Sequence, residues 1–282
     1  MLDTTQPMKI SFGIIKLLFD ISALLSHQKA SKVLASCAPQ HDMVDATDKE
    51  VPYLVYLYSE SLSYSCAGTL IDPYWILTAA HCVQSLGVDE YFTAIIGASS
   101  LKPILSGNYY YYDEYEIHSD ISTDQIFIHP DFIGTVLTGY EYDVALINLY
   151  DPSAKSFPVL DAYYDTAQIG DQVWAMGWGM ICDASEIVNS EIVVNFPQET
   201  TATLHDYADC DVITTSEQCT WGDESVYICL PDSGGPVVIK GSSSTEEDML
   251  VGIISNPEDN CPTTQIKYVP IYLIFEWIME YI

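Results

Sequence analysis

The stretch Val51-Pro-Tyr-Leu-Val-Tyr-Leu-Tyr58 indicates how the chain folds, because β-branched, aromatic and other apolar residues follow one another with no helical period. Short runs of this composition, bounded by turn residues, are typical of β-strands. Comparable runs recur at residues 67–71, 74–78, 144–149, 172–176, 236–240 and 250–254. Their regular spacing predicts an all-β sandwich or barrel, and the lack of long helical patterns between them disfavours a doubly wound α/β fold.

The ends and the middle of the chain differ from this β pattern. Residues 271–282, with Pro270 near their start, predict a C-terminal helix. The polar stretch 151–156 predicts a linker near the middle of the chain. Met8 and Lys9 followed by the apolar residues 10–19 resemble a secretory leader, although Lys16 interrupts it, so residues 1–38 are expected to be a signal segment; a signal anchor or a buried helix are the alternatives.

Composition limits the classes of function. Hydrophobic residues make up 49% of the 282 residues, which supplies a sizeable core and excludes disorder over most of the chain. Forty Asp and Glu against nine basic residues, all of them lysine, give a net charge of −31. Such a chain repels phosphate backbones and anionic membranes, so a nucleic-acid or membrane-surface partner is not expected, whereas a cationic partner is compatible with the charge.

The eight cysteines are an even number and contain no Cys-x-x-Cys pair. Zinc sites usually need such close pairs, so neither a metal nor another cofactor is predicted. Disulfides are the better interpretation of these cysteines, and they imply an oxidising compartment, consistent with secretion.

Three short strings carry the candidate chemistry: Leu77-Thr-Ala-Ala-His81-Cys82, Tyr142-Asp143-Val-Ala-Leu-Ile147 and Cys229-Leu-Pro-Asp-Ser233-Gly-Gly-Pro236. A serine hydroxyl becomes a strong nucleophile only when an imidazole takes its proton. The imidazole in turn needs a carboxylate that holds its tautomer and stabilises its charged form. We therefore expect Ser233, His81 and Asp143 to be a nucleophile, a general base and an orienting carboxylate.

These strings, in the chain order His, Asp, Ser, resemble the chymotrypsin/trypsin-like S1 family of serine peptidases. The resemblance extends from about residue 45 to residue 282 and includes Gly177-Trp-Gly179 and Trp277-Ile278. It implies an all-β fold of two six-stranded antiparallel barrels and a C-terminal helix. The expected peptidase domain is 39–282, with the first barrel at about 51–150, the second at about 160–268 and the helix at about 270–282.

The family resemblance also implies the disulfide pairs. Cys66–Cys82 would hold the loop that carries His81, and Cys210–Cys219 would close a short loop in the second barrel. The remaining two expected pairs are Cys229–Cys261 and Cys37–Cys182.

Two departures from the family concern the reaction itself. The family's oxyanion hole uses the backbone amides of the nucleophile, here Ser233, and of a glycine two residues before it, which is Pro231 in this chain and has no N–H. In the family a terminal ammonium, freed by cleavage after Arg or Lys, pairs with the carboxylate at Asp232. This chain has no arginine, and its nearest upstream lysine, Lys32, lies several residues too early, so Asp232 is expected to lack that partner.

The resemblance places the substrate pocket at Tyr227, Ile228, Ser255, Pro257 and Ile266. The floor position is Tyr227 instead of the acidic residue of trypsin-like members, which disfavours cleavage after Lys or Arg. Pro257 replaces a residue whose amide would donate to the substrate strand, and Ile266 replaces a glycine of the wall. Only small or apolar side chains are expected to fit.

Two functions remain open at this point. The first is a secreted serine endopeptidase that acts on a polypeptide substrate through an acyl-enzyme, slowed by the defective oxyanion hole. The second is a non-catalytic homologue whose acidic surface binds a cationic partner. The sequence does not determine the oligomeric state.

Overall fold

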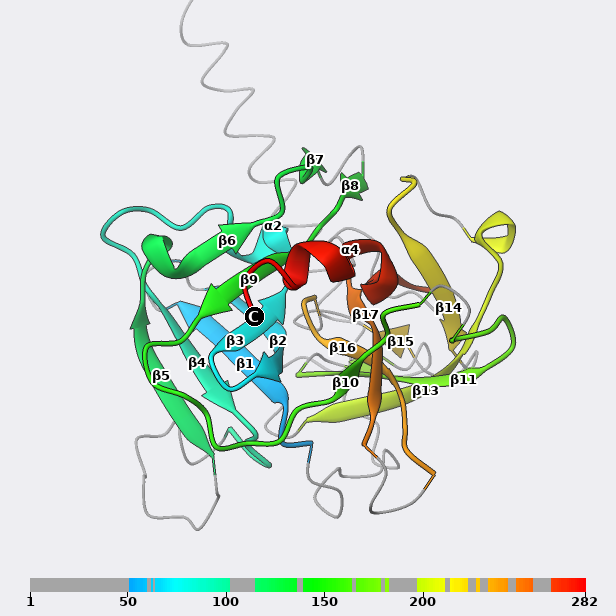
Figure 1. Cartoon of the computed structure of the whole chain (residues 1–282), viewed down its shortest axis with the longest axis horizontal. Coiled ribbons are helices and arrows are strands. Elements are labelled where there is room, and N and C mark those ends of the chain that lie inside the picture. The colour runs from blue at the N-terminus through cyan, green and yellow to red at the C-terminus, as the bar shows by residue number, and fades with distance from the viewer. Residues whose placement is uncertain are drawn as a thin grey trace, which may run out of the picture.

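A computed structural model describes residues 51–59, 62, 64–101, 115–135, 139–163, 166–178, 181–182, 197–210, 214–222, 227–228, 233–242, 247–255 and 265–282. Two large sheets stand side by side, the first from the blue-to-green half of the chain and the second from the half that runs from green through yellow to orange-red (Figure 1). The expected leader, residues 1–38, lies outside the described residues.

The first sheet has seven strands in the described residues, in the order β5-β4-β1-β2-β3-β9-β6, and all neighbours are antiparallel. Its strands are β1 (Leu54–Ser59), β2 (Tyr64–Asp72), β3 (Trp75–Thr78), β4 (Phe92–Ile96), β5 (Glu116–Ile121), β6 (Ile126–Ile128) and β9 (Ala145–Asn148). A short helix, α2 (Ala80–Val83), follows β3, and the 3-10 turn η2 (Thr123–Gln125) precedes β6. Between β6 and β9, the chain forms a small hairpin of β7 (Ile133–Thr135) and β8 (Gly139–Glu141).

The second sheet closes on itself as a six-stranded barrel, because β17 pairs with both β16 and β18. Its strands are β11 (Gln172–Gly177), β13 (Gln198–Leu204), β14 (Gln218–Gly222), β16 (Pro236–Ile239), β17 (Met249–Ile254) and β18 (Gln265–Pro270). A seventh strand, β10 (Val159–Leu160), adds to β17 in parallel. The 3-10 turn η3 (Tyr207–Asp209) follows β13, and β12 (Ile181–Cys182) pairs separately with β15 (Tyr227–Ile228).

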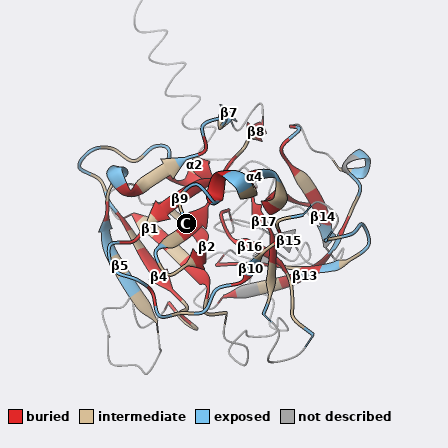
Figure 2. Ribbon diagram, in the orientation of Figure 1, coloured by how far each residue is buried: buried red, intermediate tan, exposed pale blue. Residues whose placement is uncertain are grey.

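Alternating burial in the strands creates the two cores. In β1, Leu54, Val55 and Leu57 are buried, whereas Tyr56 and Tyr58 are half-buried. A smaller apolar cluster fills the second barrel and comprises Val173, Ala175, Ala202, Leu204, Val237, Val251, Ile254, Ile266 and Tyr268. Buried residues accordingly follow the strands of both sheets (Figure 2). A larger cluster fills the first sheet and continues across its contact with the second barrel, where it includes Met176, Trp178, Val238, Leu250, Ile253 and Val269.

The C-terminal helix α4 (Ile271–Ile278) connects the two halves. It begins after Pro270 and packs on β17 and β18 of the second barrel. On the other side its Trp277 ring lies 4.8 Å from the ring of His129, which follows β6 of the first sheet. Tyr281, just beyond the helix, contacts Trp75 and Phe127 at ring distances of 5.6 and 5.1 Å.

The predicted all-β fold with a C-terminal helix is confirmed. The second half is a closed six-stranded barrel, and the first half is a curled sheet whose edge strands, β5 and β6, do not pair with each other in the described residues. The disulfides Cys66–Cys82 and Cys210–Cys219 are both present, as predicted. None of the helices in the described part of the chain is long and apolar enough to cross a bilayer.

The inward face of α4 gives a test of its role in packing. Ile274 is 1% exposed, whereas its neighbour Leu273 is 37% exposed. We expect Ile274→Ala to lower the free energy of unfolding by about 2–5 kcal/mol, because it leaves a cavity between the helix and the sheets. Leu273→Ala, the matched control, should change it by less than about 1 kcal/mol. Urea unfolding followed by tryptophan fluorescence measures both; equal losses would contradict the packing described.

Candidate active site

His81 is placed by a strand pairing and a disulfide. β3 ends at Thr78, which is opposite Ala145 of β9, and α2 with His81 follows immediately. The next residue, Cys82, is bonded to Cys66 of β2, with a Cα–Cα distance of 6.2 Å. Because Asp143 lies two residues before Ala145, the β3–β9 register brings His81 and Asp143 to the same end of the first sheet.

Asp143 is fully buried and accepts three hydrogen bonds from described residues. Its Oδ1 accepts from the backbone N–H of His81 at 2.8 Å, and its Oδ2 lies 2.6 Å from His81 Nδ1. Oδ2 also accepts from Ser255 Oγ at 2.7 Å. An ionised carboxylate only accepts hydrogen bonds, so Nδ1 carries the proton of the neutral ring and Nε2 is the nitrogen able to take one.

The residue before Asp143 has an uncommon backbone conformation. Tyr142 has a φ of 48°, which costs a non-glycine residue roughly 1–2 kcal/mol. Its backbone N–H donates to Ser216 Oγ at 2.8 Å, and its ring stacks on that of His129 at 4.7 Å. Burial lowers the pKa of His129, and its Nδ1 accepts from the Asp131 backbone, so this ring packs as a neutral group. These contacts hold the turn that directs Asp143 inward.

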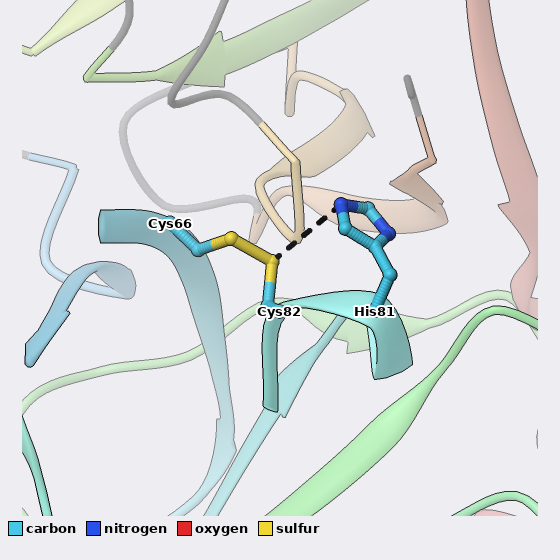
Figure 3. A group of neighbouring side chains, drawn as sticks. All are labelled: Cys66, His81 and Cys82. Carbon is cyan, nitrogen blue, oxygen red and sulfur yellow. Dashed lines mark hydrogen bonds between the residues drawn. A yellow bond between two sulfur atoms is a disulfide. The ribbon is translucent and has the colours of Figure 1, made fainter. Parts of the chain in front are cut away.

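The ring of His81 has close neighbours on several sides. Tyr140 of β8 stacks on it at 5.2 Å, with an interplanar angle of 9°. The sulfur of Cys82 lies 3.9 Å from His81 Nε2 (Figure 3). Cys66, His81 and Cys82 thus bring two sulfurs and a nitrogen together, but the sulfurs are joined in a disulfide and offer no thiolate to a metal ion.

Ser233 is 1% exposed and lies where the two sheets meet. Its carbonyl accepts from the Ala67 N–H of β2 at 2.9 Å and lies 3.7 Å from Cys82 Sγ, beside the helix that carries His81. The following amide, of Gly234, donates to Ile254 O of β17 at 2.8 Å. One turn is therefore held by a strand from each sheet.

Only glycine fits after Ser233. Gly234 has a φ of +86°, and a Cβ there would lie 2.2 Å from Thr78 Oγ1 and 2.3 Å from Ala67 O. Both distances are far below van der Waals contact. The Ser233-Gly234 sequence therefore allows the turn to approach β2 closely, which brings Ser233 next to Cys82.

Sequence patterns missed a buried carboxyl group next to this site. Glu217, which precedes β14, is 2% exposed, and its Oε1 lies 3.3 Å from Ser255 Oγ. Its Oε2 accepts from Thr214 Oγ1 at 2.9 Å. A glutamate among Thr, Ser and Gln is typical of a surface loop, so no local signal indicated that it is buried.

The segment 214–217 is hydrogen-bonded to the segment that carries Asp143. Thr214 Oγ1 lies 3.0 Å from Tyr140 O, and the backbone N–H groups of Thr215 and Ser216 each donate to the Glu141 carboxylate at 3.2 Å. Together with the Tyr142–Ser216 bond, these contacts attach the second half of the chain to the loop that positions Asp143.

Ser255 and Ile266 are the predicted pocket residues whose side chains are described. The Ser255 hydroxyl contacts Asp143 and Glu217, a role that the sequence did not predict. Ile266 lies on β18 in the apolar interior of the second barrel. Tyr227 and Ile228 form β15 opposite β12, whose second residue is Cys182; only their backbones are described. The remaining predicted residues lie outside the described part of the chain: Pro231, Asp232, Pro257, Cys37, Cys229 and Cys261.

Glu217 should make stability depend on pH. Burial raises its pKa from 4.5 to about 7, with a smaller contribution from the charge of Asp143. The folded protein then keeps a proton that the unfolded chain releases above pH 4.5. The free energy of unfolding should therefore fall, by about 3 kcal/mol from this group, as the pH rises from 4.5 to 7.

Glu217→Gln removes this titration, so the variant should become more stable relative to the native protein across that pH range. Urea unfolding at pH 4.5, 5.5 and 7 measures the difference. Glu280→Gln removes the same charge from an exposed position, and its curve should remain parallel to the native one. A Glu217→Gln curve that is also parallel would contradict the burial of the carboxyl group.

Comparison with known proteins agrees with this arrangement. The sequence model described as Trypsin matches residues 42–278. The chain is 26% identical to Tonin of Rattus norvegicus over 245 residues, which cover 81% of this chain and 84% of Tonin. It is 25% identical to Melanization protease 1 of Drosophila melanogaster over 241 residues, which cover 77% of this chain but only 58% of that protein. Since the family match spans both sheets and every described residue of the site, this chain belongs to the trypsin family of S1 serine peptidases.

Proposed function

We propose that the protein is a serine endopeptidase that hydrolyses peptide bonds with Ser233 as nucleophile, His81 as general base and Asp143 as orienting carboxylate. The contact that carries the proposal is the 2.6 Å hydrogen bond between His81 Nδ1 and Asp143 Oδ2, reinforced by the bond from the His81 backbone to the same carboxylate. The pair holds the tautomer in which Nε2 is a base.

In the proposed reaction, Ser233 Oγ attacks the carbonyl carbon of the peptide bond and its proton passes to His81 Nε2. The carbonyl oxygen becomes an oxyanion that accepts from the Ser233 backbone N–H. The C–N bond then breaks, and the amine leaves with the proton from His81. A water molecule hydrolyses the acyl-enzyme by the same route, which restores the serine hydroxyl.

The proposed oxyanion hole has one donor fewer than the family has. Pro231 cannot supply the second amide, and the loss of one such donor typically lowers kcat by about 10²–10³. We therefore propose slow turnover. For the pocket, Tyr227 and Ile228 favour a small or apolar side chain before the scissile bond.

We propose an oxidising, extracellular location for the protein. The Cys66–Cys82 and Cys210–Cys219 disulfides support it, because such bonds persist mainly outside the reducing cytosol. The two further pairs, Cys229–Cys261 and Cys37–Cys182, belong to the same proposal.

A second candidate is a non-catalytic homologue that binds a cationic protein. Three features of the sequence favour it: Pro231 in the oxyanion loop, Pro257 in the substrate wall, and the lack of an arginine or a nearby lysine for activation by cleavage. An Asp232 carboxylate without an ammonium partner would be costly to bury and would favour an unactivated pocket. The net charge of −31 fits a cationic partner.

A fluorophosphonate probe distinguishes the two candidates. It phosphonylates an activated serine with loss of fluoride, so we expect intact-mass and peptide analysis to find the adduct on Ser233. Ser233→Ala should abolish the labelling, and His81→Ala should reduce it to background because no base takes the proton.

Ser119→Ala, which removes an exposed hydroxyl on β5, is the control and should leave labelling unchanged. If the native protein takes up no probe, even after limited proteolysis before residue 45, the peptidase proposal fails and the binding role is favoured.

Pro231→Gly tests the oxyanion defect. Restoring an amide at this position should raise the rate of peptide hydrolysis at least about tenfold. Pro152→Gly, at an exposed position in the chain segment between β9 and β10, should leave the rate unchanged. A Pro231→Gly variant that is no faster than the native protein would instead indicate that the limiting defect is an Asp232 without its ammonium partner.

A further inference from the structure

We propose that Glu217 is a positioning residue of the active site, which acts on Asp143 through the hydroxyl of Ser255 and makes that contact depend on pH. The proposal rests on the peptidase function proposed above. It concerns a carboxyl group that no motif of the sequence indicates.

Glu217, Ser255 and Asp143 form a buried hydrogen-bonded series. Ser255 and Asp143 are both 0% exposed and Glu217 is 2% exposed. Ser255 Oγ lies 2.7 Å from Asp143 Oδ2 and 3.3 Å from Glu217 Oε1. Water has little access to these three side chains, so in each protonation state their hydrogen bonds must come from other protein groups.

The protonation state of Glu217 determines which hydrogen bonds link Glu217, Ser255 and Asp143. A serine hydroxyl has one hydrogen to donate and two lone pairs that accept. When Glu217 is ionised, it and Asp143 are both acceptors and compete for that hydrogen. When Glu217 is protonated, its own O–H can donate to Ser255 Oγ, and Ser255 then donates to Asp143 without competition.

The surroundings of Glu217 place this change in the neutral range. Desolvation by burial is the largest influence and raises its pKa to about 7; the hydrogen bond from Thr214, the charge of Lys267 on β18 and the bond to Ser255 lower it, and the charge of Asp143 raises it. The other charged group on the adjoining segment is Glu141 of β8, which bonds to Thr215 and Ser216 and not to Ser255.

Ionisation of Glu217 has consequences for His81. It adds a second negative charge beside Asp143 and competes for the Ser255 hydrogen bond, so more negative charge faces the imidazole. Both effects favour the protonated ring, which cannot act as a base. The titrations of Glu217 and His81 are therefore coupled and should appear as two steps that belong to the pair.

The test follows the ring nitrogens of His81 by NMR in the full chain labelled with ¹⁵N-histidine, from pH 5 to 9, with the His81 signals assigned by their loss in His81→Gln. The native protein should titrate in two steps. Glu217→Gln keeps the shape and a donor but cannot ionise, so it should titrate in one step with its midpoint about 0.5–1 pH lower. Glu141→Gln, the matched control, should retain both steps.

Ser255→Ala tests the path. Without the hydroxyl, Glu217→Gln should move the midpoint by less than it does in the native background, as in a double-mutant cycle. An equal movement would overturn the role of Ser255. Equal movement by Glu141→Gln and Glu217→Gln would likewise overturn the proposal, because charge alone would then account for it.

The remaining outcomes also decide the proposal. If Glu217→Gln lowers Tm but leaves the His81 midpoint in place, Glu217 is merely structural and the proposal fails. If that variant does not fold, a one-step titration of the native protein overturns the proposal and a two-step titration supports it. The NMR measurement does not need turnover. If the titrations of His81 and Glu217 are coupled but the fluorophosphonate probe does not label the protein, the peptidase function alone is contradicted.

Discussion

The burial of the Asp143 charge is the constraint on which the rest of the site depends. A carboxylate without access to water is costly unless strong hydrogen bonds compensate it. Here they come from the backbone and ring of His81 and from the hydroxyl of Ser255. Satisfying the charge therefore also orients the imidazole, so that the requirement for stability and the requirement for a base are met by the same contacts.

Both halves of the chain are needed to meet this constraint. His81 and Asp143 come from the first sheet, whereas Ser255 follows β17 of the second barrel. The Ser233 turn is bonded to β2 on one side and to β17 on the other. α4 joins the halves by packing on β17 and β18 and by placing Trp277 against His129, which stacks on Tyr142 beside Asp143. The geometry of the site is thus a property of the contact between the two sheets, and neither sheet alone provides it.

The segment 214–217 adds hydrogen bonds and a buried carboxyl group to the contact between the two sheets. It binds the loop of Asp143 through Thr214, Thr215 and Ser216, and it brings a third ionisable group, Glu217, within three hydrogen bonds of the imidazole. In a chain with so few basic residues, Lys267 on β18 is the cation whose charge acts on this carboxyl group. The proposed peptidase would accordingly combine a weakened oxyanion hole with a base whose environment changes near neutral pH.

Local patterns in the sequence determined the β class, the C-terminal helix and the residue types at His81, Asp143 and Ser233, because strand periodicity and the order of short motifs are properties of neighbouring residues. The resemblance that those motifs carry added the Cys66–Cys82 and Cys210–Cys219 disulfides, which the described part of the chain contains. Only the tertiary structure decided that Glu217 is buried and that Ser255 donates to Asp143. Residues 143, 217 and 255 are far apart in the chain and lie next to strands β9, β14 and β17. These strands are held in their sheets by backbone hydrogen bonds that every residue can make, so no side-chain pattern predicts that the three residues come into contact.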